Sequence, residues 1–332
     1  EPEPMEYVRV CDVYGAGFYY IPGTETCLRV GGYLRYDIRV GDAAVYNGLQ
    51  DVNDRLDGGT DDTYFKRARA AVQLDARSET ELGTLRSYIH LNFNWDTFRN
   101  DDNDSDTRTS VAINHAYIEL GGFRIGKTDS LFSTFTGYAG GVIMDDIILY
   151  GPFDTHQIAY TYTGGNGFSA AVAVEEGAGP DFTLDSYVPH VVAGVGYTQA
   201  WGGVSGVVGY DSVWEEWTGK VRLDVNATET VSLFIMGAYG SDDNVAQSFY
   251  KQWDGNWAVW GGGSAQLTEK AKLNIQLSYT EAEDFAAVAG VNYQLVPGLT
   301  ITPEIAYTDN FDAPDGVDAD GVTGFLRFQR NF

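Results

Sequence analysis

The side chains of this sequence that are best placed to do chemistry are arginines at alternating positions. In residues 27–40, Arg29, Arg35 and Arg39 occupy odd positions, and the even positions are mostly apolar. A β-strand directs successive side chains to opposite faces, so this segment predicts a strand with one cationic and one apolar face. A row of fixed cations offers no reacting group. It offers an electric field that orients dipolar or charged solutes.

Later segments of the chain repeat the pattern with further arginines. Clustered like charges in a dry core would be prohibitive, because an isolated buried ion loses many kcal/mol of hydration. A water-filled lumen removes that penalty, so we predict that the arginines form one basic wall of a pore. For each arginine taken alone, a surface position or an ion pair within the barrel is the alternative. The predicted basic wall comprises Arg29, Arg35, Arg39, Arg67, Arg69, Arg86, Arg124, Arg222 and Arg327.

Residues 128–154 interrupt the alternation for longer than any other stretch outside the acidic loops. This segment holds apolar side chains that a surface loop rarely carries, including Phe132 and Ile147. A long loop with apolar contacts of its own is usually functional or packed against something. We therefore predict a constriction loop that folds onto the lumen wall and sets carboxylates opposite the basic wall. These carboxylates are Asp129, Asp145, Asp146 and Asp154.

Residues 121–128, GGFRIGKT, satisfy the GxxxxGK[ST] pattern of a phosphate-binding P-loop, which would indicate an NTPase. That motif needs a helix after its glycine-rich loop, so that backbone N–H groups converge on phosphate. Here the residues inside the motif alternate like a strand, and serine, threonine and paired glycine follow them. An NTPase is therefore the less favoured interpretation.

Cys11 and Cys27 are the only cysteines. Their even, minimal number predicts one disulfide in an oxidising compartment such as the periplasm or cell surface, with two unrelated buried thiols as the alternative. The four histidines lack metal-ligand spacing, and the chain has no CxxC, HExxH or GxSxG motif. We therefore expect no metal, no cofactor and no enzymatic activity. An embedded hydrolase with catalytic residues far apart in sequence stays an alternative.

The elements that must position these groups are short alternating segments. No run approaches the roughly 18 apolar residues of a membrane-spanning helix, whereas Gly (40), Tyr (22) and Phe (17) are plentiful. Such segments are typical of an all-β chain. Sixteen strands of about ten residues would use ~160 residues and leave the others for turns and loops. The prediction is a 16-stranded antiparallel transmembrane β-barrel, a single domain over 1–332 in which residues 1–26 form an N-terminal arm.

Many of the apolar faces end in Trp or Tyr. Aromatic rings at both ends of spanning strands form the interfacial girdle of outer-membrane barrels. Cross-strand aromatic pairing in a soluble sheet is the alternative. We favour the girdle, because the opposite face stays polar in one segment after another. The residues concerned are Trp95, Tyr160, Tyr197, Tyr210, Trp217, Tyr239, Tyr279 and Tyr307.

The net charge of −26 argues against nucleic acid as a partner. The acid is concentrated in runs at 51–62, 100–106, 242–243 and 309–320, which we interpret as solvated loops. Solubility alone accounts for these runs. The alternative is that the loop carboxylates share divalent cations with lipopolysaccharide.

The whole sequence resembles the general porins of alphaproteobacteria, a family that includes Brucella and rhizobial porins. The resemblance is carried by the segment 6–37 with both cysteines, by SETELGTL at 78–85, by FTGYAGGVIMDD at 135–146 and by the ending LRFQRNF. It implies a 16-stranded outer-membrane barrel, a homotrimer and an inward third loop, and it implies that Phe332 is the barrel-assembly signal. Arg330 departs from the apolar residue usual at its position, and the acidic loops have no counterpart in the family pattern.

Together these observations predict a porin of a Gram-negative outer membrane. It would form a water-filled channel for passive diffusion of small hydrophilic solutes and ions. A substrate-specific sugar channel is the first alternative, and the P-loop NTPase is a distant second.

Overall fold

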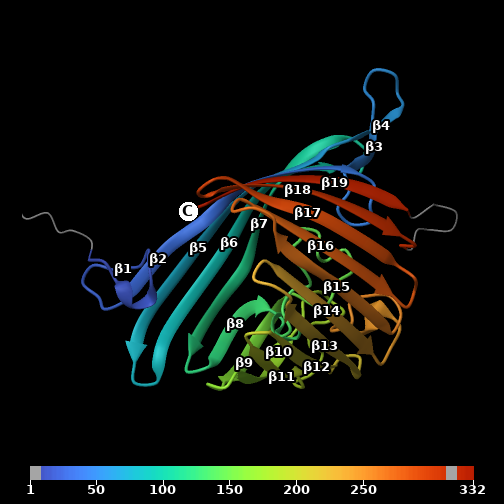
Figure 1. The fold of residues 1–332 in the computed structure, drawn as a ribbon. Helices are drawn as coiled ribbons and strands as arrows, with labels where there is room; N and C mark the ends of the chain where they lie inside the picture. Colours follow the sequence, from blue (N-terminus) through green and yellow to red (C-terminus); the bar gives the residue numbers. More distant parts are fainter. Residues whose placement is uncertain (1–8, 312–319) are drawn as a thin grey trace, which may run out of the picture.

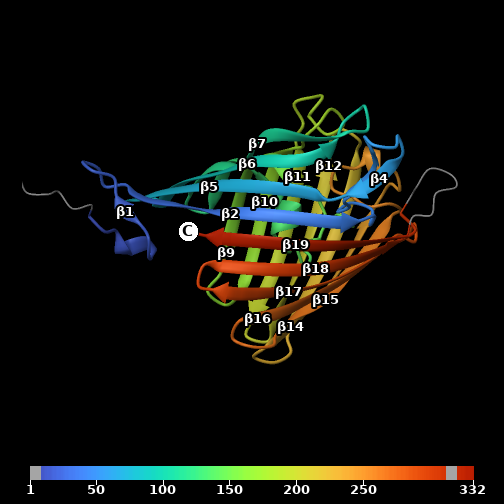
Figure 2. The same ribbon diagram turned by 90° about the horizontal axis from the view of Figure 1, so that it is seen from above.

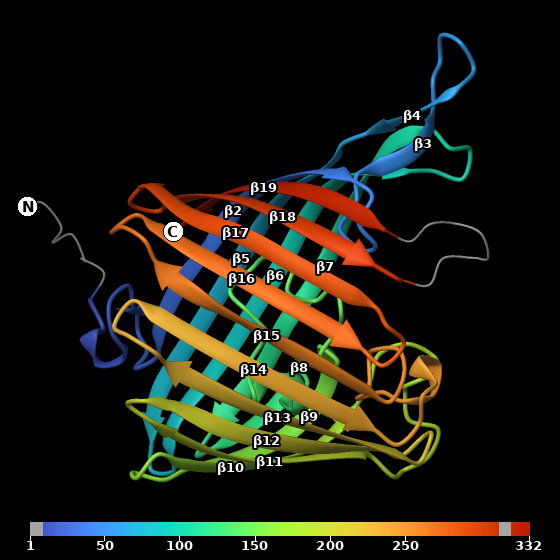
Figure 3. The same ribbon diagram turned by 45° about the vertical axis from the view of Figure 1, so that its right-hand side comes forward.

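The computed structural model describes residues 9–311 and 320–332, and it shows a closed antiparallel barrel (Figures 1 and 3). Seventeen strands form one sheet, and the two-residue β1 (Tyr19–Tyr20) lies outside the ring. The remaining sixteen strands confirm the predicted fold, and β2 pairs with β19 to close the ring. The barrel strands are β2 (Cys27–Gly41), β5 (Phe65–Thr80), β6 (Gly83–Arg99), β7 (Ser105–Leu120), β8 (Phe123–Asp129), β9 (Asp154–Thr163), β10 (Phe168–Glu176), β11 (His190–Gln199), β12 (Gly202–Asp211), β13 (Glu216–Asn226), β14 (Val231–Gly240), β15 (Trp257–Gln266), β16 (Ala271–Thr280), β17 (Phe285–Val296), β18 (Leu299–Asp309) and β19 (Gly321–Asn331).

The two ends of the barrel differ in their connections. At one end, tight turns join consecutive strands, as at residues 121–122 between β7 and β8. At the other end the connections are longer, as at 42–64, 130–153 and 241–256. In outer-membrane barrels short turns face the periplasm and long loops face outwards. We call these ends the short-turn end and the long-loop end.

The long connections carry the small elements of the fold. β3 (Leu49–Asn53) and β4 (Thr60–Thr63) form a separate hairpin within 42–64, and this hairpin projects beyond the barrel rim (Figure 3). The helix α1 (Leu131–Thr134) lies in 130–153, and the 3-10 turn η2 (Val245–Gln247) lies in 241–256. Of the helices in the described residues, none has the length and apolar character needed to cross a membrane.

Alternate side chains of the barrel strands meet different surroundings, as the sequence predicts. On β2, the outward Leu34 is 57% exposed, whereas the inward Asp37 is 4% exposed. Aromatic side chains of the outer face gather near both ends of the strands. The rings of Trp217 and Tyr239 lie 5.9 Å apart near the long-loop end, and those of Phe123 and Tyr160 lie 4.9 Å apart near the short-turn end.

The barrel wall is not equally tall all the way round. β5, β6 and β7 have 16, 17 and 16 residues, against 9 to 12 in most of the other barrel strands. These strands and β2 form the bright blue and cyan side of the barrel seen from above (Figure 2). At their short-turn end lies the described part of the N-terminal arm, residues 9–26, while residues 1–8 of the predicted arm fall outside the described residues.

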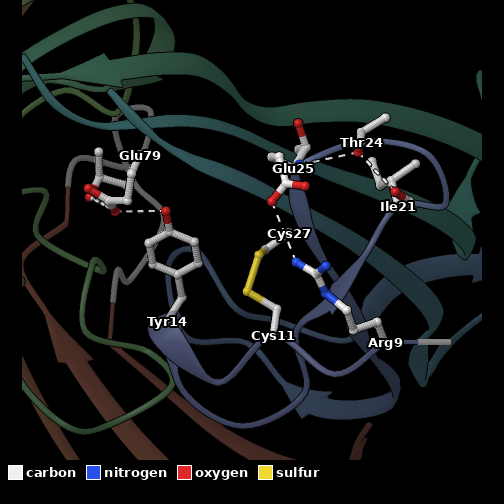
Figure 4. Close-up of a disulfide and its surroundings, with 10 residues drawn as sticks. Arg9, Cys11, Tyr14, Ile21, Thr24, Glu25, Cys27 and Glu79 are labelled. Carbon is white, nitrogen blue, oxygen red and sulfur yellow. Dashed lines mark hydrogen bonds and ion pairs between the residues drawn. A yellow bond between two sulfur atoms is a disulfide. The ribbon is translucent and has the colours of Figure 1, made fainter. Parts of the chain in front are cut away.

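A disulfide ties the arm to the barrel. Cys11 and Cys27 are bonded, with Cα atoms 6.0 Å apart, and this confirms the predicted disulfide (Figure 4). The arm also rests on the β5–β6 hairpin, since the Tyr14 hydroxyl donates to Glu79 at 2.7 Å. The arm includes η1 (Asp12–Tyr14), and β1 pairs with the first residues of β2.

Candidate functional site

The basic wall takes shape on β2, β5, β6, β8 and β19. These strands hold eight of the nine predicted arginines, all but Arg222. Strand register places their side chains in level rows, so that Arg35 stands opposite Arg69, and Asp37 opposite Arg67. Nearer the short-turn end, Arg29, Asp75 and Tyr88 share a row.

Five of these eight arginines are held in ion pairs within the wall. Arg327 binds Asp37 through two hydrogen bonds of 2.7 and 2.9 Å, and Arg67 binds Asp96 through two of 2.7 and 2.8 Å. The alternative to a place in the pore wall was, for each arginine, an ion pair within the barrel. These five arginines form such ion pairs. Arg327 and Arg67 each have a carboxylate of their own, whereas Arg29, Arg86 and Arg124 share Asp75 and Glu119, and Asp75 also pairs with Arg77. The other pairs are Arg29–Asp75 (3.7 Å), Arg86–Asp75 (3.1 Å), Arg86–Glu119 (2.7 Å) and Arg124–Glu119 (2.7 Å).

The other three arginines have no carboxylate partner among the described residues. Arg35 donates to the side-chain amide oxygen of Gln329 at 2.8 Å, and Arg69 donates to that of Asn94 at 2.7 Å. The Arg39 guanidinium lies over the Phe65 ring, 3.6 Å from its centroid. Neutral partners leave the positive charge in place. Uncompensated charge therefore gathers on β2 and β5, on the long-loop side of Tyr33.

Arg222 lies apart from the other predicted arginines. It extends from β13 and pairs with Asp224 on its own strand at 2.8 Å. It also donates to the carbonyl oxygens of Tyr138 and Ala139. Arg222 is thus an attachment point for the predicted constriction loop, not a member of the wall opposite it.

The predicted constriction loop occupies residues 130–153, which we call the inward loop. Its predicted limits, 128–154, are wider because β8 and β9 continue to pair as far as Asp129 and Asp154. At its base, the buried Glu175 carboxylate accepts hydrogen bonds from Ser130 Oγ and from the Leu131 N–H, both at 2.7 Å. Glu175 faces inward from β10, so the loop begins fixed to the wall.

Further along, the inward loop is pinned to four more strands. The Glu304 carboxylate of β18 accepts from the backbone N–H groups of Ile143 and Met144, both at 2.8 Å. Three inward side chains donate to backbone carbonyl oxygens of the loop. These bonds are Lys220 to Tyr150 (2.7 Å), Trp260 to Ile148 (2.9 Å) and Gln276 to Asp145 (2.7 Å).

Small inward residues make room for the apolar side chains of the loop. Met144, Ile147 and Ile148 join a buried cluster with alanines and larger residues of β14–β19. On β11, a Cβ added at Gly194 would lie 2.5 Å from the Phe135 ring, so glycine is what admits that ring. Where the inward loop covers it, the inner wall from β9 to β18 therefore carries a dry layer, whereas nearer the short-turn end a polar cavity is lined by Asn226, Ser264 and Lys272. At the level of the loop, the remaining lumen is bounded by the loop and the basic wall.

The four predicted acids divide between the loop and its base. Asp145 accepts from the Tyr150 hydroxyl at 2.9 Å, and Asp146 accepts from that of Tyr46. Burial, followed by the neighbouring charge of Asp146, raises the pKa of Asp145 to about 7. Burial also raises the pKa of Asp146.

The other two acids lie at strand ends. Asp129 accepts from the Tyr138 hydroxyl at 2.6 Å, and the exposed Asp154 pairs with Lys127.

One tyrosine lies between the basic wall and the inward loop. Tyr46, in the connection after β2, bonds to Asp146 and lies 5.5 Å from the Arg39 guanidinium carbon. The wall and the loop acids therefore approach each other near the long-loop end of β2. Sequence reasoning did not single out Tyr46, because the connection that holds it has no periodicity.

Sequence reasoning also missed the two carboxylates that hold the loop. Along their strands, Glu175 and Glu304 are single acids on inward faces that otherwise hold serine, alanine or threonine, and that contrast is a usable signal. A second inward segment was missed as well. In 241–256, the buried Tyr250 hydroxyl donates to Glu175 at 3.0 Å, and Phe249 joins the cluster around Leu131.

The motifs that suggested other functions have plain structural roles. Within GGFRIGKT, Gly121 and Gly122 form a hairpin turn, and the remaining residues belong to β8. The chain therefore lacks a helix there to complete a P-loop. No group of three or more His, Cys, Asp or Glu side chains in the described part of the chain is arranged to hold a metal ion.

Comparison with known proteins agrees with this architecture. Porin Omp2a of Brucella melitensis biotype 1 is 50% identical, over 100% of this chain and 92% of that protein. Porin Omp2b of Brucella suis biovar 1 is 48% identical over the same shares.

Two solved structures share the fold at low identity. The outer membrane channel DcaP of Acinetobacter baumannii has a TM-score of 0.71 at 16% identity, covering 94% of this chain and 99% of that one. An anion-selective porin from Comamonas acidovorans has a TM-score of 0.57 at 13% identity, covering 93% and 100%.

The family model described as the porin subfamily matches residues 1–325. Together with full-length identity of about half to proteins named porins, this match makes the chain a channel for passive diffusion and not an enzyme. The chain belongs to the porin subfamily.

Proposed function

We propose that small hydrophilic solutes and ions cross an outer membrane through the passage between the basic wall and the inward loop. Three guanidinium groups without a carboxylate partner, those of Arg35, Arg39 and Arg69, carry this proposal. On the other side of the passage lie Asp145 and Asp146. Opposite charges across a narrow wet gap create a transverse field, which orients dipolar solutes and disfavours apolar ones.

The passage needs neither an energy source nor a large movement. Hydrogen bonds from five barrel strands and from Tyr46 hold the inward loop. The position of the loop therefore sets a fixed limit on the size of the solutes that pass. Outer-membrane residence in a Gram-negative cell is the setting that the family and the apolar outer face support. In that setting the lumen is the route through an otherwise impermeable layer.

The loop acids provide the direct test of the transverse field. Replacing Asp145→Asn and Asp146→Asn together removes negative charge from one side of the passage only. We expect reversal potentials in planar bilayers, measured under a salt gradient, to shift towards anions. A matched control is Asp101→Asn with Asp102→Asn, two exposed acids in the connection between β6 and β7. Equal reversal potentials for the loop variant and the wild type would count against this placement.

Liposome swelling separates a general pore from a substrate-specific channel. Neutral sugars and polyols of increasing size should enter at rates that fall smoothly with size. Rates that saturate with concentration for one solute and not for others of its size would favour a specific channel as the main activity.

A homotrimer is the assembly that we propose, as the resemblance to general porins implies. Support comes from the tall side of the barrel, where a shallow outer groove of about 590 Å³ runs over β2, β5, β6 and β19. Ala68, Ala70 and Trp95 are among the residues that line it, and Trp95 is 59% exposed. The turn of the projecting β3–β4 hairpin holds Leu56, whose side chain is 97% exposed in the single chain and is therefore free to contact another subunit. Ala70→Arg should convert the assembly seen by native mass spectrometry in detergent into monomers. The matched control is Ala170→Arg on the outer face of β10, away from the groove, which should leave the assembly intact.

We also propose that the exposed loop acids contact lipopolysaccharide through shared divalent cations. Because no three acids in the described residues form a cation site, each ion would need phosphate oxygens to complete its shell. Mg²⁺ should therefore raise the thermal stability of the protein in lipopolysaccharide-containing vesicles and leave it unchanged in lipid without phosphorylated saccharide. Equal effects in both vesicles would contradict this proposal.

A further inference from the structure

One row of inward side chains crosses the neighbouring strands β19, β2, β5, β6 and β7 (Figure 2). Arg35 of β2 and Arg69 of β5 stand directly opposite each other in the middle of this row. Gln329 of β19 stands beside Arg35. On the other side, Asn94 of β6 stands beside Arg69 and is followed by Ser110 of β7. We call these five residues the arginine row.

Hydrogen bonds within the row hold both guanidinium groups by the same atom. Arg35 Nε donates to the side-chain amide oxygen of Gln329 at 2.8 Å, and Arg69 Nε donates to that of Asn94 at 2.7 Å. Both amides are held in turn, because each donates a hydrogen bond to a further polar side chain. The two arginines are therefore anchored from opposite ends of the row.

The remaining N–H groups of these arginines face the lumen. A guanidinium has several N–H donors, and the Nε–H is only one of them. The Nη atoms of Arg35 and Arg69 have no hydrogen-bond partner among the described residues, and they are not buried. The Arg35 guanidinium carbon lies 4.5 Å from the centroid of the Tyr33 ring, which supports its flat face and leaves its Nη edge free. Each arginine thus presents the edge with which a guanidinium binds an oxyanion through two parallel hydrogen bonds.

The rows on either side do not neutralise these two charges. Towards the long-loop end, the acids of the next row already have arginines of their own, in the pairs Arg327–Asp37 and Arg67–Asp96. Towards the short-turn end, the next row is uncharged and consists of Asn331, Tyr33, Ala71 and Asn92. Like charges directly opposite each other in a sheet are destabilising. The arginine row therefore holds two positive charges together at a local cost, which an anion bound between them would remove.

We propose that the arginine row is a binding site for a small, doubly charged oxyanion, either a phosphate group or a short dicarboxylate. The anion accepts hydrogen bonds from the Nη atoms of Arg35 and Arg69, while Gln329 and Asn94 keep both guanidinium groups in place. This inference rests on the proposed function, because the anion reaches the row through the lumen. It adds a binding step that saturates, which a transverse field alone does not provide.

The number of positive charges distinguishes this ligand class from others. A neutral solute compensates neither guanidinium, and a singly charged anion compensates one of them. A doubly charged oxyanion compensates both, and its oxygen atoms match the paired donors of the two Nη edges. The row therefore selects for a second negative charge.

Blocking of the ion current by dianions tests the site. Inorganic phosphate or malonate, added in mildly alkaline buffer to single channels in a planar bilayer, should reduce the current with a concentration dependence that saturates. Acetate at the same total charge should reduce it much less. Arg35→Gln and Arg69→Gln should each weaken the blocking affinity of the dianions by about tenfold, the effect expected from losing one charged contact.

Lysine variants separate binding at the row from general attraction. Replacing Arg35→Lys and Arg69→Lys together keeps both charges, so reversal potentials should stay close to those of the wild type. An ammonium group lacks the flat edge with two parallel donors, so the blocking affinity of the dianions should still fall by about tenfold. Wild-type affinity in this double variant would overturn the row as a specific site.

The matched control is Arg330→Gln, which removes the same charge beside Gln329 but from the outer face of β19, and which should be blocked like the wild type. Wild-type conductance without a saturating block by either dianion would overturn the site and leave the channel standing. Equal block by acetate, or equal affinity in all variants, would also overturn it. Absence of conductance in the wild type would instead contradict the proposed function.

Discussion

Removing the carboxylate of Glu304 should release the inward loop from the barrel wall. This side chain is 6% exposed and accepts two 2.8 Å hydrogen bonds from the N–H groups of Ile143 and Met144. A hydrogen bond to a charged group contributes about 1.5–3 kcal/mol. Glu304→Ala should therefore weaken docking of this part of the loop by about 3–6 kcal/mol. The apolar contacts of Ile147 and Ile148 persist, so we expect partial release.

The lower of these values already predicts a large effect on the open pore. Since 1.4 kcal/mol is tenfold in an equilibrium, a loss of about 3 kcal/mol raises the undocked population about a hundredfold. Single-channel recordings in planar bilayers should then show a larger mean conductance and more open-channel noise. Glu304→Gln keeps one acceptor oxygen and should lie between the wild type and the alanine variant.

The control for this perturbation is Glu229→Ala, an exposed acid in the turn between β13 and β14. It removes the same charge without touching the loop. Heat-dependent mobility on SDS gels should show that all variants form folded barrels. Wild-type conductance, noise and solute size limit in a folded Glu304→Ala protein would refute the view that this carboxylate holds the loop.

Three further predictions follow from the wall, the loop acids and the arm. Replacing Arg35→Gln and Arg69→Gln together should shift reversal potentials in planar bilayers towards cations. Arg86→Gln should mainly lower the free energy of unfolding, by about 2 kcal/mol, because Asp75 and Glu119 lose charged hydrogen bonds. A larger change of reversal potential in Arg86→Gln, with a larger loss of thermal stability in the double variant, would contradict this assignment of roles. Lowering the pH from about 8 to about 6 should reduce cation preference, because Asp145, whose pKa is raised to about 7, loses its negative charge. Burial also raises the pKa of the neighbouring Asp146, so Asp145→Asn should diminish the change without abolishing it. An identical pH response in that variant would exclude Asp145. Replacing Cys11→Ser and Cys27→Ser together should leave the barrel folded but release the arm, since a disulfide that closes a loop of this size contributes about 3 kcal/mol. Limited proteolysis should therefore cut residues 9–26 faster in this variant than in the wild type. Equal cleavage rates would indicate that the contacts of Tyr14 and Phe18 suffice to hold the arm.

Alternation along single strands made the barrel predictable, because it depends only on neighbouring residues. The inward and outward faces of β2, β6 and β13 follow directly from their sequences. In β7 an irregularity at residue 114 reverses the alternation, so that Val111 and Ile113 face outward before it and Ile118 after it. Strand limits were less accurate. β7 begins at Ser105, within a run of acidic and polar residues that predicts a loop, because pairing with β6 continues past the end of the apolar face.

Which arginines are paired with a carboxylate could not be predicted from the sequence. The Arg327–Asp37 pair joins residues 290 positions apart, and it exists only because β19 closes against β2 in one register. A shift of one residue would turn these side chains to opposite faces. Periodicity therefore identified which arginines face inward, while register decided which of them keep an unpaired charge.

The inward face also contains a division that alternation cannot reveal. Inward residues such as Ala258, Ala286 and Ala306 are fully or almost fully buried, although they belong to the surface that a simple barrel would expose to water. They are buried because the inward loop covers them, so the interior has a dry side under the loop and a wet side on β2 and β5–β8. Charged residues gather on the wet side, and the loop is held by single carboxylates, such as Glu304, set among small residues. A row of small inward residues with one acid is therefore a sequence signal for where a loop docks inside a barrel, and alternation between inward and outward faces cannot supply it.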